Sequence, residues 1–140
     1  MQRRTLLLAL AALPAAVLAA KAGAEQPRNR IVFQVNEEDG RKWLSILVNI
    51  RNIQAELGKG HSAIALVAIG PGLGMLKADA VVANEVQDAI KAGVEFIACG
   101  NSMQAQHLDR EDLTDGVGVV KAGYVELMKR QQLGWAYLRP

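Results

Sequence analysis

Residues 93–103, GVEFIACGNSM, contain Cys99, which is the one cysteine in the 140-residue chain. An apolar run ends at this thiol, and small polar residues follow it directly. A thiol between a strand end and a helix start faces unpaired backbone N–H groups and the positive end of a helix dipole, and both favour the thiolate. Gly100 has no side chain to block access, and Asn101 and Ser102 add hydrogen-bond donors. Without a partner cysteine the thiol cannot close an intrachain disulfide, but it can carry a sulfane sulfur, a sulfenic acid or a mixed disulfide.

Two other interpretations of Cys99 stay open. A free cysteine is often a small buried hydrophobe, so the thiol can simply fill space at the end of a strand. The stretch CGNS is also a C-x-x-S motif, which predicts a monothiol redox protein. Thioredoxin-like enzymes place a cis-proline opposite that motif, and this chain has no proline between Pro71 and Pro140, which makes the redox interpretation the weakest.

A glycine-rich segment, GPGLG, occupies residues 70–74. It reads GxGxG instead of the GxGxxG fingerprint of dinucleotide-binding proteins, and Pro71 has no N–H to offer a phosphate. One interpretation is a tight turn that needs a positive φ angle. The other is a backbone wall, made by Gly70, Gly72 and Gly74, along which a ligand approaches Cys99.

The hydrophobic pattern predicts strands that alternate with helices. Expected strands cover residues 30–35, 62–69, 94–99, 117–120 and 135–138. Expected helices cover residues 41–57, a segment capped by Asp79 and ended by Gly93, residues 101–108 and residues 122–133.

This alternation predicts one α/β domain over residues 25–140, a three-layer sandwich with a mostly parallel sheet of about five strands and helices on both faces. In such sheets ligands bind beyond the carboxyl ends of the strands. Cys99 and the glycine-rich segment both follow strands directly, so we expect them to face one shared pocket.

The amino terminus has the layout of an export signal. Arg3 and Arg4 precede an apolar stretch at residues 6–20, and Ala22-Gly23-Ala24 offers a cleavage site. The apolar stretch is shorter than the ~20 residues that span a bilayer, so cleavage is expected over permanent anchoring. The paired arginines fit a twin-arginine signal, and the general secretory route stays open. The expected location is the periplasm or another exported compartment.

The charge balance changes once residues 1–24 are removed. The full chain has 16 Lys and Arg against 14 Asp and Glu, and three of the basic residues but no acidic residue lie before residue 25. The remaining chain therefore has 13 basic and 14 acidic residues, which does not suggest a nucleic-acid partner. His61 and His107 have no ligand-like spacing with Cys99, so neither a metal nor another cofactor is expected.

Residues 30–140 resemble the DsrE/DsrF-like sulfur-relay family, in its small exported branch. The matching segments are IVFQV, GPGLGMLKAD, GVEFIAC followed by SM, and VKAGYVELMKRQQLGWAYLRP. The resemblance implies a parallel α/β sheet, a homo-oligomer such as a trimer or hexamer, and a sulfur-donor or sulfur-acceptor protein as partner. Relay members carry a persulfide on a cysteine that follows a strand, and Cys99 is the matching position. The implied function is that of a sulfur carrier or sulfurtransferase accessory. The alternative is a binding or assembly module of the same fold with a structural Cys99.

Overall fold

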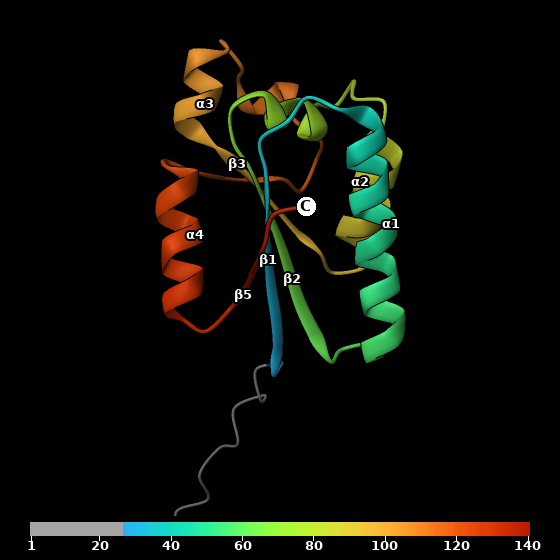
Figure 1. The fold of residues 1–140 in the computed structure, drawn as a ribbon. Helices are drawn as coiled ribbons and strands as arrows, with labels where there is room; N and C mark the ends of the chain where they lie inside the picture. The colour runs from blue at the N-terminus through green and yellow to red at the C-terminus, as the bar shows by residue number, and fades with distance from the viewer. Residues whose placement is uncertain (1–26) are drawn as a thin grey trace, which may run out of the picture.

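The chain folds around a five-stranded sheet in the order β4-β3-β2-β1-β5, and every pair of neighbouring strands is parallel (Figure 1). The computed structural model describes residues 27–140, so the expected export signal lies outside the described residues. The strands are β1 (Asn29–Val35), β2 (Ser62–Ala68), β3 (Glu95–Cys99), β4 (Gly118–Val120) and β5 (Ala136–Leu138). The α-helices are α1 (Gly40–Leu57), α2 (Ala83–Lys91), α3 (Gly100–Ala105) and α4 (Gly123–Gln132), and two 3₁₀ segments are η1 (Gly70–Leu76) and η2 (Arg110–Asp112).

Helices cover both faces of the sheet, as the sequence predicts. Figure 1 shows α1 and α2 on one side and α4 on the other, with α3 above α4 near the carboxyl ends of the strands. Within residues 27–140, no helix is long and apolar enough to cross a bilayer.

Each face of the sheet has its own apolar core, because successive strand residues point to opposite sides. The larger core lies under α1 and α2 and includes Phe33, Leu66 and Phe96. The smaller core lies under α4 and includes Val32, Val67, Ile97, Cys99 and Leu127. The thiol of Cys99 therefore belongs to the α4 side of the sheet.

Local sequence explains most of the helix boundaries. Asp39 caps α1, because its carboxylate accepts the backbone N–H groups of Arg41 and Lys42 at 3.0 and 3.2 Å. Gly58 ends that helix with a φ of 87°, a conformation that a glycine adopts without steric cost.

Three expectations need correction. Asp79 does not cap α2, whose N-cap is Val82; the Asp79 carboxylate instead lies 3.2 Å from Lys77 Nζ. The helix after Cys99 ends at Ala105 instead of residue 108, and His107 follows with a φ of 53°. The glycine-rich segment is more than a tight turn, because it continues as a 3₁₀ helix to Leu76.

Candidate functional site: the thiol between β3 and α4

Cys99 is the last residue of β3 and the N-cap of α3. Its side chain is 4% exposed and packs in the smaller core. The backbone N–H of Gly123, the first residue of α4, donates a hydrogen bond to the Cys99 Sγ at 3.3 Å. The thiol is therefore in contact with the positive end of a ten-residue helix that lies 24 residues further along the chain.

Hydrogen bonds join the segments that follow β2, β3 and β4. The Gly70 N–H donates to Ser102 Oγ at 2.8 Å, and Gln106 Nε2 donates to the Gly70 carbonyl at 2.7 Å. The Asn101 N–H donates to the Lys121 carbonyl at 3.0 Å. Since these bonds hold three loops against one another, the surroundings of the thiol are fixed by backbone as well as by side chains.

Burial and polar contacts act in opposite directions on the Cys99 thiol. Burial raises its pKa, because the apolar core disfavours the charged thiolate. The Ser102 hydroxyl and the N–H groups of Gly123, Ser102 and Asn101 lower the pKa, and together they outweigh burial. The pKa of Cys99 therefore lies below its ordinary value, in the direction that the sequence predicts for a thiol at a helix start.

Ser102 has one hydroxyl proton and two acceptor lone pairs. The Gly70 N–H uses one of the lone pairs, which leaves the hydroxyl proton free to point toward the sulfur. This arrangement explains how a serine three residues after Cys99 stabilises the thiolate.

The residues predicted to share a pocket with Cys99 separate into two groups. The Gly70 N–H donates to Ser102 Oγ, and Gly70 has a φ of 56°, a conformation that suits glycine. A Cβ at Gly72 would collide with the Val35 carbonyl at the end of β1, and a Cβ at Gly74 would lie 2.9 Å from the Trp43 ring of α1. These two glycines therefore permit close packing against β1 and α1.

Gly100 and Asn101 lie next to the thiol but act mainly through their backbones. A Cβ at Gly100 would stand 3.0 Å from the Val120 carbonyl oxygen, so glycine here lets β4 approach closely. The Asn101 side chain is exposed, and its backbone N–H is the group that ties α3 to Lys121.

Sequence reasoning missed Gly123, the residue that contacts the sulfur from α4. A Cβ at this position would lie 2.7 Å from Ile69 and 3.2 Å from the Cys99 Cβ, so the approach of α4 to β3 requires glycine. The sequence does contain a signal for this residue, because Gly123 stands at the start of the apolar pattern of a helix. That pattern cannot show which strand the start of the helix contacts.

The site lies where the chain leaves neighbouring strands in opposite directions. After β2 the chain leads through η1 to α2, on the α1 side, whereas after β3 it leads to α3, on the α4 side (Figure 1). Divergent connections at the carboxyl ends of parallel strands are where open α/β sheets usually bind ligands. Among residues 27–140, no group of three or more His, Cys, Asp or Glu is arranged to hold a metal ion.

These features define a small parallel α/β protein with a single, buried thiol at the carboxyl edge of its sheet. The family profile for the DsrE/DsrF-like family matches residues 30–140, and the chain belongs to this family. A search of curated proteins found no match.

Solved structures with the same fold support this assignment. A protein of unknown function from Methanobacterium thermoautotrophicum, MTH1491, is 37% identical, with a TM-score of 0.76 over 80% of this chain and 99% of that one. BT1422 of Bacteroides thetaiotaomicron is 14% identical, with a TM-score of 0.67 over 84% of this chain and 100% of that one. The YchN protein of E. coli is also 14% identical with a TM-score of 0.67, over 80% of this chain and 99% of that one. At 14% identity the last two show the fold alone.

Proposed function

We propose that this protein is an exported sulfur carrier that holds sulfane sulfur as a persulfide on Cys99. The DsrE/DsrF-like family is generally linked to sulfur relay, and the chain matches its profile over residues 30–140. The observation that carries the proposal is the thiol itself, which ends β3, accepts the Gly123 N–H and has a lowered pKa. The basic and apolar layout of residues 1–24 supports the export part of this proposal.

The transfer step is a thiolate exchange without net oxidation. The Cys99 thiolate attacks the terminal sulfur of a donor persulfide, a new S–S bond forms, and the donor's own S–S bond breaks. The donor leaves as a thiolate that carries the negative charge, and Cys99 becomes a persulfide whose outer sulfur keeps the donor's proton. An acceptor thiolate then attacks that terminal sulfur and releases the Cys99 thiolate again. The N–H of Gly123 and the hydroxyl of Ser102 stabilise the Cys99 thiolate that attacks in the first step and is released in the second.

A structural role for Cys99 is the second candidate, and one observation favours it. The side chain is 4% exposed and packs among Val67, Ile97 and Leu127 in the smaller core. A thiol that only fills this core would react slowly with any reagent in the native state.

Persulfide loading separates the two candidates. The purified protein is incubated with a low-molecular-weight persulfide, and its intact mass is measured beside that of Cys99→Ser. The carrier function predicts that the wild type gains one sulfur atom and passes it on to an added thiol, whereas the variant gains none. A wild type that gains no sulfur from the native state would favour the structural role.

A further inference from the structure

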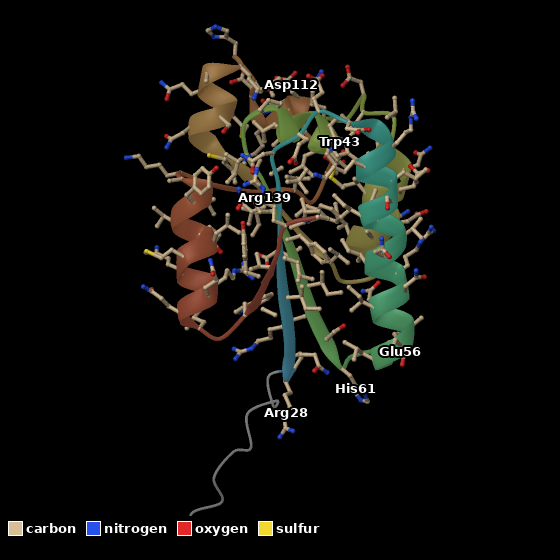
Figure 2. The ribbon with its side chains drawn as sticks, viewed as in Figure 1. Arg28, Trp43, Glu56, His61, Asp112 and Arg139 are labelled. Carbon is tan, nitrogen blue, oxygen red and sulfur yellow. The ribbon has the colours of Figure 1, made fainter. Side chains whose placement is uncertain are left out.

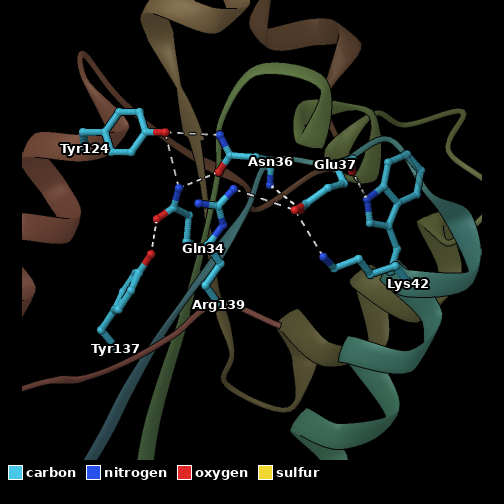
Figure 3. A network of polar contacts seen from close by, with 8 residues as sticks. Gln34, Asn36, Glu37, Lys42, Tyr124, Tyr137 and Arg139 are labelled. Carbon is cyan, nitrogen blue, oxygen red and sulfur yellow. Dashed lines mark hydrogen bonds and ion pairs between the residues drawn. The ribbon is translucent and has the colours of Figure 1, made fainter.

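Gln34 is an unusual residue for the position that it occupies. It lies near the carboxyl end of β1 and is 3% exposed, and its side chain joins residues of α4 and β5 by hydrogen bonds. A buried amide in a strand of apolar residues needs partners, and Gln34 has three. The Tyr137 hydroxyl donates to its carbonyl oxygen, and its nitrogen donates to Asn36 Oδ1 at 2.6 Å and to the Tyr124 hydroxyl at 3.4 Å (Figure 3).

The two tyrosines approach the amide from different elements. Tyr124 comes from α4 and is 59% exposed, whereas Tyr137 comes from β5 and is 38% exposed. Their hydroxyls both turn toward Gln34, so their rings lie on either side of it (Figure 3). The amide therefore fixes two partly exposed aromatic rings in place.

A cavity of about 670 Å³ lies between these rings, in the size range of small-molecule sites. Leu127 and Met128 of α4 form its apolar part, and Gln131 and Gln132 add amides. The three residues of β5 beside this cavity are all exposed.

One cation lines this cavity. The Arg139 guanidinium lies 3.8 Å from the Glu37 carboxylate, which is longer than a direct charge-assisted hydrogen bond. Glu37 is also 3.2 Å from Lys42 Nζ and accepts the Asn36 N–H at 3.2 Å. Lys42 and Arg139 together carry two positive charges against the one negative charge of Glu37, so this cluster has one positive charge in excess. Within residues 27–140 the Arg139 guanidinium makes this one ion pair.

We propose that this cavity binds a small organic anion with a flat apolar body, independently of the chemistry of Cys99. The charged group of the ligand pairs with Arg139, and its body lies against Leu127 and Met128 between the rings of Tyr124 and Tyr137. A guanidinium recognises a carboxylate or a similar planar anion through two parallel hydrogen bonds, which accounts for the class of ligand.

The test uses 2-naphthoate and its neutral counterpart, 2-naphthamide, in a chemical-shift titration of the full protein. Naphthoate is expected to shift the resonances of Gln34, Tyr124 and Gln131 and to bind about tenfold more tightly than naphthamide, as for a charge-assisted hydrogen bond. Arg139→Gln is expected to remove that preference. Arg28→Gln is the matched control, because it removes the same group at the opposite end of the sheet and leaves the preference intact (Figure 2).

Three outcomes would overturn the proposal. The first is equal binding of the acid and the amide to the wild type, and the second is no shift of cavity residues up to millimolar ligand. The third is occupation of the cavity by a second copy of the chain. Light scattering would then give Arg139→Gln a different mass from the wild type, and the ligand would shift no resonances. Cys99→Ser is expected to lose sulfur loading but to bind naphthoate as the wild type does, so either proposal can fail without the other.

Discussion

At the scale of single residues, the chemistry proposed for Cys99 depends on how its buried sulfur can carry a negative charge. The smaller core alone would keep Cys99 neutral, because moving a charge into apolar surroundings costs free energy. The Gly123 N–H and the Ser102 hydroxyl supply the opposing stabilisation. Both are fixed by the backbone, since Gly123 begins α4 and Ser102 is held by Gly70. The thiolate is therefore stabilised by groups that the fold already holds in place.

Replacement of Cys99 by serine should preserve the fold. Serine is nearly isosteric and its hydroxyl can accept the same N–H groups, so we expect a loss of about 1 kcal/mol or less at neutral pH. The lowered folded pKa means that the thiolate stabilises the wild type above the unfolded pKa of about 8.5, and that this contribution is lost as the pH falls through the folded pKa. Denaturant unfolding of both proteins from pH 7 to pH values above about 8.5 should show that the difference between their free energies of unfolding grows as the pH rises. A difference that is constant with pH would contradict the lowered pKa.

Ser102→Ala should raise the pKa of Cys99 and leave the fold intact. The variant loses the hydroxyl that stabilises the thiolate, and it also leaves the Gly70 N–H without its acceptor at 2.8 Å. The pH dependence of iodoacetamide alkylation reports the thiol pKa directly, and its midpoint should move upward. Ser45→Ala, an exposed serine on α1, is the control and should leave the midpoint unchanged. If the midpoint of Ser102→Ala does not move, Ser102 does not stabilise the thiolate.

Part of this site could be predicted from the residues alone. A cysteine that ends an apolar strand pattern and precedes Gly100-Asn101-Ser102 indicates a thiol at a helix start, and the structure places it there. Gly123 could not be predicted, because its contact with the sulfur depends on the packing of α4 against β3. The contacts of Gly72 with Val35 and of Gly74 with Trp43 could not be predicted, because a glycine pattern shows that backbone must come close but not what it approaches.

At the scale of elements, α4 decides how the thiol is covered. Its first residue contacts Cys99, its Leu127 fills the smaller core, and its Tyr124 and Met128 line the cavity on the β5 side. One short helix therefore serves two separate sites, each at the carboxyl end of a different strand.

Gly123→Ala tests the contact between α4 and Cys99. The added methyl group would lie 2.7 Å from Ile69 and 3.2 Å from the Cys99 Cβ, so the start of the helix must move away. We expect a destabilisation of about 1–3 kcal/mol and a higher thiol pKa, because overpacking strains the core and the N–H leaves the sulfur. Unfolding in urea and alkylation against pH measure the two effects.

Gly118→Ala provides the matched control on β4. Its added methyl would lie 3.7 Å from the Phe96 carbonyl oxygen, which is ordinary contact. The control should keep both the stability and the thiol pKa near those of the wild type. Equal behaviour of the two variants would show that α4 tolerates displacement and does not set the thiol pKa.

The elements themselves were largely predictable, because buried parallel strands are continuous apolar runs and the helices repeat with a period of 3.6. The pattern indicated nine helices and strands, and each has a counterpart in the structure. The errors lie at ends set by tertiary contacts: Asp79 pairs with Lys77 instead of capping α2, and α3 stops at Ala105 before the turn at His107. The strand order also depends on packing that no single segment encodes.

At the scale of the whole molecule, processing of residues 1–24 should follow export. We expect the mature protein to begin at Glu25, because a small-residue site at residues 22–24 follows a short apolar stretch. N-terminal sequencing of protein recovered from the exported fraction checks this, and retention of Met1 there would contradict it. Replacement of Arg3 and Arg4 together by lysine keeps the charge, so export should stop only if the twin-arginine route is used.

Homo-oligomerisation is the last prediction, and the surface of α4 gives it a specific form. Val125 of α4 is 45% exposed, and Leu133 at the end of this helix is 64% exposed. Exposed aliphatic side chains on one element favour burial against a second copy, and closed symmetry would bury the same patch on every subunit.

Light scattering at micromolar concentration should therefore give a mass that is a multiple of the monomer. The double variant Val125→Lys, Leu133→Lys should reduce it to the monomer mass, because two charges cannot be buried unpaired at an interface. Leu44→Lys, Val48→Lys is the matched control: these residues of α1 are 43% and 37% exposed on the opposite face of the molecule, and their replacement should leave the mass unchanged. A wild type of monomer mass would refute assembly, and dissociation of the α1 variant alone would move the interface to the other face.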